Sequence, residues 1–139
     1  MDPADWLLAQ LAATALHAGF QLTVTLVVYP ALAAVPSSGW QVAHDAHSRR
    51  ITPLVGVAYV AALVACTGAA VGTRSPGSLV ALGATLAAVA VTAAAAAPTH
   101  GRLGRQGRDD ALVARLLRAD RWRCAAALVA LAGAAAASA

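Results

Sequence analysis

The sequence predicts an all-α integral membrane protein, in which four transmembrane helices form one bundle and a single domain over residues 1–139. The first observation is the composition, because 60% of the residues are hydrophobic and only 12% are charged. The second is a mean hydropathy of +0.68, which is unusual for a soluble domain. The third is the presence of four apolar stretches, at residues 6–28, 53–72, 78–97 and 122–138.

The lengths of these stretches fit a bilayer. A transmembrane helix needs about 20 apolar residues to cross a hydrocarbon core of about 30 Å, so three stretches are long enough and the fourth is at the short end. The first stretch does not resemble a cleaved signal peptide, because it follows the acidic sequence MDPAD where a signal peptide carries basic residues. Tyr29-Pro30 should end this helix, since proline cannot continue the hydrogen-bonded ladder.

The next connection, residues 31–52, predicts a short interfacial helix between the first two spans. Pro36 and Gly39 belong to a turn signal, and the partly amphipathic sequence WQVAHDAHSRR follows it. Trp40 would then lie in the headgroup layer, where tryptophan is enriched.

The remaining connections differ in character. TRSPGS, residues 73–78, is typical of a tight turn, whereas PTHGRLGRQGRDD, residues 98–110, is polar, basic and rich in glycine. Asp109-Asp110 should begin the last helix, because acidic residues complement the dipole at a helix N-terminus. Asp120 lies on the apolar side of that helix, and Arg123 can either snorkel toward the headgroups or pair with Asp120.

All ten basic residues are arginine, and their distribution predicts how the chain crosses the membrane. Nine of them follow the first or third span, and only Arg74 lies between the second and third. Because basic residues collect in cytoplasmic loops, the first and third connections should be cytoplasmic and both termini outside. The lysine-free, alanine-rich composition is typical of a GC-rich bacterial genome, so the expected location is the bacterial inner (plasma) membrane. This topology explains the net charge of +4 without nucleic acid as a partner.

A polar stripe runs along the first span. Gln10, Thr14, His17, Gln21 and Thr25 follow one another at steps of four, three, four and four, which puts them on one helical face. Such a stripe can hydrogen-bond to neighbouring helices, or it can line a polar cavity. An ionisable residue near mid-membrane favours the cavity, because it is costly there. The sequence leaves both interpretations open.

Three histidines lie near the ends of predicted spans. His44 and His47 form an H-D-A-H motif at i and i+3, and His100 follows the third span on the same predicted side of the membrane. Imidazole is a common ligand of copper, iron, zinc and nickel. Metal binding, metal-free acid–base chemistry and a structural role all remain open. A carboxylate that ligates or orients a ligand could come from Asp45, Asp109 or Asp120.

Four short motifs span most of the chain: Tyr29-Pro30, W-x-x-x-H-x-x-H-x-R-R-I from Trp40 to Ile51, P-x-H-x-x-L from Pro98 to Leu103, and L-x-x-x-D-x-x-R from Leu116 to Arg123. Their order resembles small bacterial four-helix membrane proteins of the anthrone-oxygenase-like family. The resemblance implies a membrane-embedded oxidase or oxygenase acting on a small aromatic or polyketide-like molecule. The chain departs from the family at Val28, where members carry histidine, and at Asp120-Arg121, where they carry Asn-Trp.

The first functional hypothesis is therefore a membrane-embedded oxidoreductase of the oxygenase type. A copper or iron ion would be held by His44, His47 and His100. His17 and Asp120 would be catalytic, and in a metal-free version His17 would act as the base. A small hydrophobic substrate entering from the lipid would contact Gln10, Thr14, Gln21, Tyr59 and Arg123.

The second hypothesis is a non-enzymatic transport, sensing or assembly subunit, in which the polar stripe packs helices or conducts protons. Haem is not expected, because His17 has no evident axial partner at matching depth on a facing helix. Besides the substrate, the lipid bilayer is the expected partner, and a homo-oligomer is compatible with the sequence.

Overall fold

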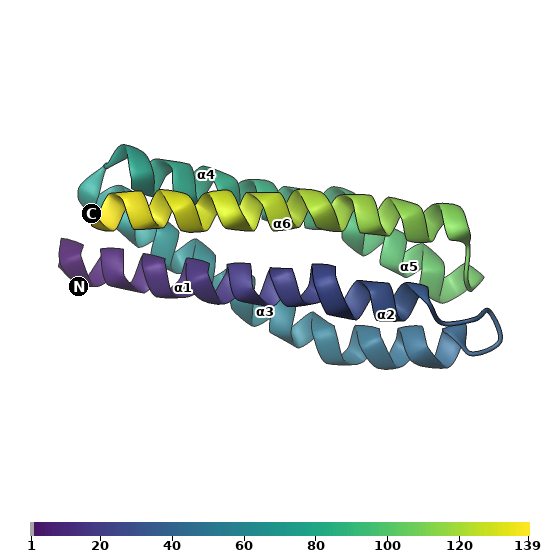
Figure 1. Ribbon diagram of the computed structural model, residues 1–139. Helices are drawn as coiled ribbons and strands as arrows, with labels where there is room; N and C mark the ends of the chain where they lie inside the picture. The colour runs from purple at the N-terminus through teal and green to yellow at the C-terminus, as the bar shows by residue number, and fades with distance from the viewer. Residues whose placement is uncertain (1) are drawn as a thin grey trace.

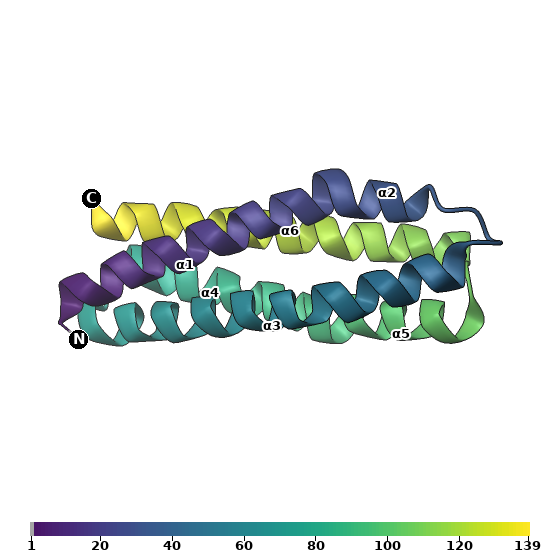
Figure 2. The same ribbon diagram turned by 90° about the horizontal axis from the view of Figure 1, so that it is seen from below.

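The computed structural model describes residues 2–139 as four long, antiparallel helical rods, which confirms the all-α prediction (Figure 1). Both termini lie at one end of the bundle together with the turn between α3 and α4, and the other two connections lie at the opposite end (Figure 1 and Figure 2). The first rod consists of α1 (Pro3–Thr23), the π-helical turn η1 (Val24–Val28) and α2 (Tyr29–Ala33), and the second rod is α3 (Trp40–Thr73). The third consists of α4 (Pro76–Val91), the π-helical turn η2 (Thr92–Ala96) and α5 (Ala97–Gln106), and the fourth is α6 (Asp110–Ser138).

Three of the rods formed by the described residues are long and apolar enough to cross a membrane, namely Pro3–Ala33, Trp40–Thr73 and Pro76–Gln106. Large apolar side chains on these rods are exposed, among them Leu8 and Val71, as expected for a bundle whose outer surface faces lipid. The rod α6 is not one of the three, because its apolar stretch is short and begins beside Arg121 and Arg123. The structure is therefore compatible with a membrane location.

Capping side chains begin three of the rods. The Asp2 carboxylate accepts a hydrogen bond from the Asp5 amide at 2.8 Å, and the Ser75 hydroxyl accepts one from the Ser78 amide at 3.2 Å. Asp109 accepts one from the amide of Leu112 at 2.8 Å, which confirms the predicted start of the last helix. Each cap satisfies an amide that has no partner within its helix.

The predicted helix end at Tyr29-Pro30 is wrong, because the first rod continues to Ala33. In η1 the amide of Tyr29 donates to the carbonyl of Val24, five residues earlier. Pro30 then lies in the first turn of α2, where a missing amide donor costs little. The same arrangement recurs in η2, just before Pro98. Each π turn inserts one extra residue, so the residues after it are rotated around the helix axis.

The predicted short interfacial helix does not form as a separate element, because residues 40–51 are the first turns of α3, which continues through Pro53. Trp40 is 1% exposed and belongs to an apolar core with Leu103 and Leu116, rather than to a headgroup layer. Most of the expected polar connection at residues 98–110 is also helical, as α5. Burial of Trp40 and Leu103 in one core stabilises both helices beyond their apolar stretches.

Near the chain termini, α4 and α6 approach each other closely through glycine. A Cβ atom added to Gly77 would lie 2.6 Å from the carbonyl oxygen of Gly133, and one added to Gly133 would lie 2.9 Å from that of Gly77. Small residues at a helix interface permit this backbone approach.

Candidate functional site

Four side chains from three rods meet at the end of the bundle opposite the termini. The Nε2 atom of His44 lies 3.1 Å from Nδ1 of His100, and the hydroxyl of Tyr29 lies 2.9 Å from Nε2 of His100. The ring of His47 stacks on that of His100, with the centroids 5.6 Å apart and the planes at 21°. These four residues are termed the histidine cluster. The structure thus brings together the three histidines that the charge pattern placed at similar depth.

Local helix geometry positions the histidine cluster. His44 and His47 are three residues apart and so share one face of α3. His100 lies in α5, just beyond η2, whose extra residue rotates it around the helix axis. Gly104 lets α5 approach closely, because a Cβ atom there would already lie 3.4 Å from Cε1 of His44. Trp40 stacks on His44, with centroids 5.5 Å apart.

The histidine cluster forms a chain of groups that can share protons. Either nitrogen of a neutral imidazole can donate or accept, depending on the tautomer, so a proton can pass between Tyr29, His100 and His44. Among residues 2–139, the buried Nδ1 of His44 and Nε2 of His47 have no hydrogen-bond partner. A carboxylate oxygen of Asp45 lies 3.7 Å from Nδ1 of His44. Two imidazole nitrogens therefore remain available to a ligand.

Two of the histidines have the spacing that one bound metal ion requires. Metal–nitrogen bonds of about 2.0–2.1 Å place two ligating nitrogens about 3 Å apart, and His44 and His100 match this separation at 3.1 Å. As they are placed, no three His, Cys, Asp or Glu residues in the described part of the chain could hold an ion. A third imidazole ligand would require rotation of the His47 ring, whose Nε2 has no hydrogen bond to lose.

A second polar group is formed by α1, α3 and α6. The Gln21 amide donates to Asp120 with Nε2 and Oδ1 2.6 Å apart, and Nε of Arg123 donates to the Tyr59 hydroxyl at 3.2 Å. The Nη1 atom of Arg123 lies 3.8 Å from Oδ1 of Asp120. The rings of His17 and Tyr59 pack edge to face, with centroids 5.0 Å apart. These five buried residues are termed the buried polar network.

The ion pair explains how the buried polar network is tolerated. An isolated buried charge is strongly unfavourable, whereas a paired and hydrogen-bonded one is acceptable. Arg123 is 3% exposed and directed toward Asp120 and Tyr59, so the alternative that it snorkels to the headgroups is wrong. His17 is buried as well, and neither of its ring nitrogens has a hydrogen-bond partner among residues 2–139.

A cavity of about 250 Å³ is lined by members of both groups, His100 and Tyr29 from the histidine cluster and Arg123 from the buried polar network. Thr52 and Ala97 at its rim are exposed, so the cavity opens on the outer surface between α3 and α5. Both π turns contribute to it, as π turns often do at functional sites. The other lining residues are Val24, Ser48, Ile51, Val55, Thr92 and Ala96.

The remaining predicted substrate residues lie elsewhere. The Ser78 hydroxyl donates to Oε1 of Gln10 at 3.2 Å, and the Thr14 hydroxyl donates to the carbonyl of Gln10 at 2.8 Å. The rise of an α-helix puts Gln10 about 16 Å from Gln21 along α1, and neither Gln10 nor Thr14 lines the cavity. The polar stripe therefore packs helices in its first half and enters the buried polar network in its second.

Two residues of the site, Tyr29 and Thr92, are not among the predicted site residues. Tyr29 has a usable signal, because an aromatic hydroxyl beside a proline within a long apolar stretch marks a place where the helix is irregular. Thr92 has a weaker signal, because it repeats at seven with Thr85 and Thr99 and so indicates an interior face of the third span. Its hydroxyl lies 2.6 Å from that of Tyr59, and this contact depends on how α3 and η2 pack.

The arrangement combines a proton-sharing chain, a cavity open on the outer surface of the bundle and a buried cation beside that cavity. It can bind a small apolar molecule, accept a proton from it and stabilise negative charge on it. Comparisons with protein-family models, with curated proteins and with solved structures find no match for this chain.

Proposed function

We propose that the protein is a membrane-embedded oxidoreductase of the oxygenase type that acts on a small aromatic or polyketide-like molecule. The observation that carries this proposal is the meeting of His100 and Tyr29 with Arg123 around one cavity that opens on the outer surface of the bundle. The motif order that resembles the anthrone-oxygenase-like family supports the same class. In this proposal the protein lies in the bacterial inner membrane, with the histidine cluster on the cytoplasmic side and both termini outside.

The residues around the cavity have complementary roles in this proposal. Apolar side chains such as Ile51 and Val55 bind the hydrophobic body of the substrate. In a metal-free reaction, His100 accepts a proton from the substrate and passes it to His44, 3.1 Å away. With a metal bound, the same two nitrogens would be ligands instead. Arg123 stabilises the resulting negative charge on a substrate oxygen, because its guanidinium group lines the cavity and carries a positive charge there.

His17 and Asp120 act on the same site from the buried polar network. Asp120 holds Arg123 in place through the ion pair. His17 packs on Tyr59, which accepts the hydrogen bond from Arg123. We therefore propose that His17 tunes the position of the Tyr59–Arg123 pair, and that in a metal-free reaction it is an additional base.

We also propose that the histidine cluster binds a copper or iron ion. His44 and His100 would hold it first, because their nitrogens have the required separation, and His47 would join after rotation of its ring. Asp45 would orient the imidazole of His44, as carboxylates commonly do for metal-bound histidine. The ion would supply the activation of dioxygen.

Elemental analysis and oxygen uptake by the detergent-purified protein test the proposal. We expect about one copper or iron per chain, oxygen uptake with a hydroxylated polycyclic aromatic, and loss of the metal in His44→Ala and His100→Ala. His17→Ala is the control, because it should retain the metal while losing turnover. Oxygen uptake by folded, metal-free protein would overturn the metal site alone, whereas no uptake by metal-loaded protein would overturn the oxygenase.

A non-enzymatic subunit is the second candidate, favoured by the Gln10–Ser78 hydrogen bonds that use the polar stripe for helix packing. This alternative predicts no turnover and tolerance of alanine at His44, His47 and His100, with His17 alone sensitive.

A further inference from the structure

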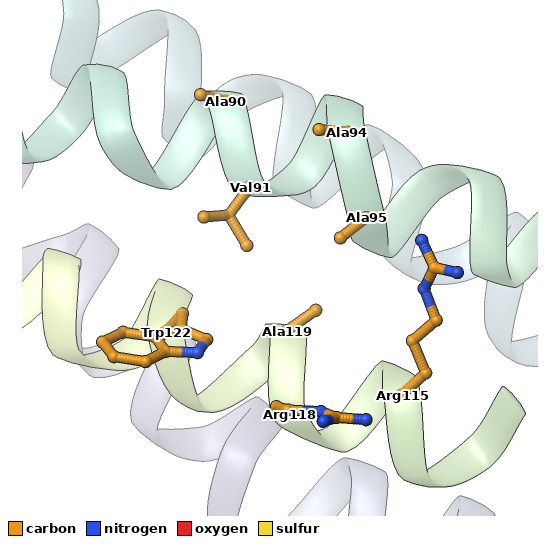
Figure 3. Close-up of a pocket in the computed structure, with 8 residues that line it drawn as sticks. All are labelled: Ala90, Val91, Ala94, Ala95, Arg115, Arg118, Ala119 and Trp122. Atoms are coloured by element: carbon orange, nitrogen blue, oxygen red, sulfur yellow. The ribbon is translucent and has the colours of Figure 1, made fainter. Parts of the chain in front are cut away.

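A second hollow lies on another surface of the bundle, between α4, η2 and α6, and has a volume of about 590 Å³. It shares no lining residue with the cavity described above. Arg115, Arg118 and Trp122 line it from α6, and the rest of its lining is aliphatic (Figure 3). It is termed the arginine groove, and its aliphatic residues are Ala90, Val91, Ala94, Ala95 and Ala119.

The aliphatic residues explain why the arginine groove is hollow. Three alanines and one valine on α4 and η2 leave the space between the two helices unfilled, and Ala119 is its buried floor. Ala90 and Ala94 are exposed on a rod long and apolar enough to cross a membrane. An extended hydrocarbon chain suits such a trough, because it can bury apolar surface along its whole length.

The charge in the arginine groove is uncompensated by the described residues. The ion pairs formed by arginine in residues 2–139 involve Arg108 and Arg123, and none involves Arg115 or Arg118. Figure 3 shows the guanidinium of Arg115 standing between the two helices at one end of the groove. Arg115 and Arg118 are three residues apart on α6 and have no carboxylate partners, which favours a phosphate, because guanidinium groups can bind it with several hydrogen bonds.

Trp122 indicates how the arginine groove is oriented relative to the membrane. It is 66% exposed and lies at the opposite end of the arginine groove from Arg115 (Figure 3). The step of seven residues from Arg115 to Trp122 corresponds to about 10 Å along the membrane normal. Tryptophan prefers the boundary between headgroups and hydrocarbon, so the arginines face the headgroup layer and the alanines at Trp122's depth face the acyl chains.

We propose that the arginine groove binds one anionic phospholipid, with the phosphate on Arg115 and Arg118 and one acyl chain along Ala90 and Ala94. Basic pockets between transmembrane helices are typical sites for anionic headgroups. A zwitterionic lipid fits less well, because its ammonium group would lie close to two guanidinium groups. The site is independent of the histidine cluster and of the proposed oxidoreductase activity.

Native mass spectrometry of the full chain in detergent, titrated with phosphatidylglycerol or with phosphatidylcholine of the same acyl chains, tests this site. We expect one phosphatidylglycerol per chain, bound at least tenfold more tightly than phosphatidylcholine. The double variant Arg115→Gln/Arg118→Gln should weaken phosphatidylglycerol binding about thirtyfold, the loss expected for two arginines near an anionic surface. Arg102→Gln/Arg105→Gln is the matched control, because it removes the same charge from exposed positions on α5 outside the groove.

A further variant and a competition experiment distinguish a bound phospholipid from other ligands of the groove. Ala94→Trp fills the trough at an exposed position and keeps both arginines, so it should also abolish tight phosphatidylglycerol binding. Glycerol 3-phosphate, which has a phosphate but no acyl chains, should not compete with phosphatidylglycerol when both are present at the same concentration. Equal binding of the two lipids, competition by glycerol 3-phosphate, an unchanged affinity in Arg115→Gln/Arg118→Gln, or occupation of the groove by a second copy of the chain would each overturn the proposal.

Discussion

The Nε2 atom of His44 lies 3.1 Å from Nδ1 of His100, although 56 residues separate the two histidines in the chain. The pair joins α3 to α5 at one side of a cavity, and the hydroxyl of Tyr29 extends it by a second contact of 2.9 Å to His100. Because three rods contribute to this chain, it exists only in the assembled bundle. Four predictions follow from these contacts and from the packing that supports them.

Tyr29→Phe should lower oxygen uptake with little change in stability. The substitution removes the hydroxyl beside His100 and keeps the ring that lies 5.8 Å from His47. Loss of a proton-transfer group should lower turnover about 10²- to 10⁴-fold, while loss of one hydrogen bond should lower the free energy of unfolding by about 1 kcal/mol. An oxygen electrode and thermal unfolding in detergent measure the two effects. Thr23→Val, which removes an exposed hydroxyl bonded to its own helix, should change neither, and full turnover in Tyr29→Phe would contradict the proton chain.

Asp120→Ala should destabilise the bundle strongly. The substitution leaves the guanidinium of Arg123 buried without its carboxylate, and it also removes the acceptor of the Gln21 amide. Breaking one side of a buried ion pair lowers the free energy of unfolding by about 3–5 kcal/mol. Asp110→Ala is the control, because it removes a carboxylate from the largely exposed pair with Arg108. The unfolding temperatures of the two variants should differ clearly, with Asp120→Ala the lower. Similar unfolding temperatures would show that Asp120 and Arg123 do not depend on each other.

Gly133→Ala should weaken the contact between α4 and α6. The added Cβ would lie 2.9 Å from backbone atoms of both Gly77 and Ala81, so the helices must separate. Overpacking of this kind costs about 1–3 kcal/mol. Gly83→Ala is the matched control in α4, because its Cβ would meet nothing within 4 Å, and it should stabilise the helix by about 0.5–1 kcal/mol. Thermal unfolding of the two variants should therefore shift in opposite directions, and a shift in the same direction would argue against the glycine contact.

Ala97→Phe should block substrate binding without removing the metal. Ala97 lies at the rim of the cavity of about 250 Å³, and a phenyl group there would occupy much of it. We expect KM for the aromatic substrate to rise at least about tenfold, because most of the pocket contacts are lost, with unchanged metal content by elemental analysis. The neighbouring exposed residue Ala93 does not line the cavity, so Ala93→Phe should behave like the wild type. An unchanged KM in Ala97→Phe would place the substrate elsewhere.

Much of the fold could be predicted without coordinates, because it depends on local properties. The apolar stretches identified the rods, Asp109 identified the start of the last helix, and the four-three-four-four spacing identified the buried face of α1. The predicted breaks were less accurate. Pro30 and Pro98 lie inside continuous rods, because a π turn precedes each of them and places the proline in the first turn of the next helix. The sequence shows the proline but does not show that a π turn precedes it.

The candidate site was predictable as a set of residue types and approximate depths, since spacing and the arginine distribution report both. The identity of each partner was not. The His44–His100 contact and the Gln21–Asp120 hydrogen bond join residues that lie far apart in the chain. The inward direction of Arg123 is one of two directions that the sequence leaves open to this side chain. Such contacts depend on the relative rotation of packed helices, to which local composition and periodicity are insensitive.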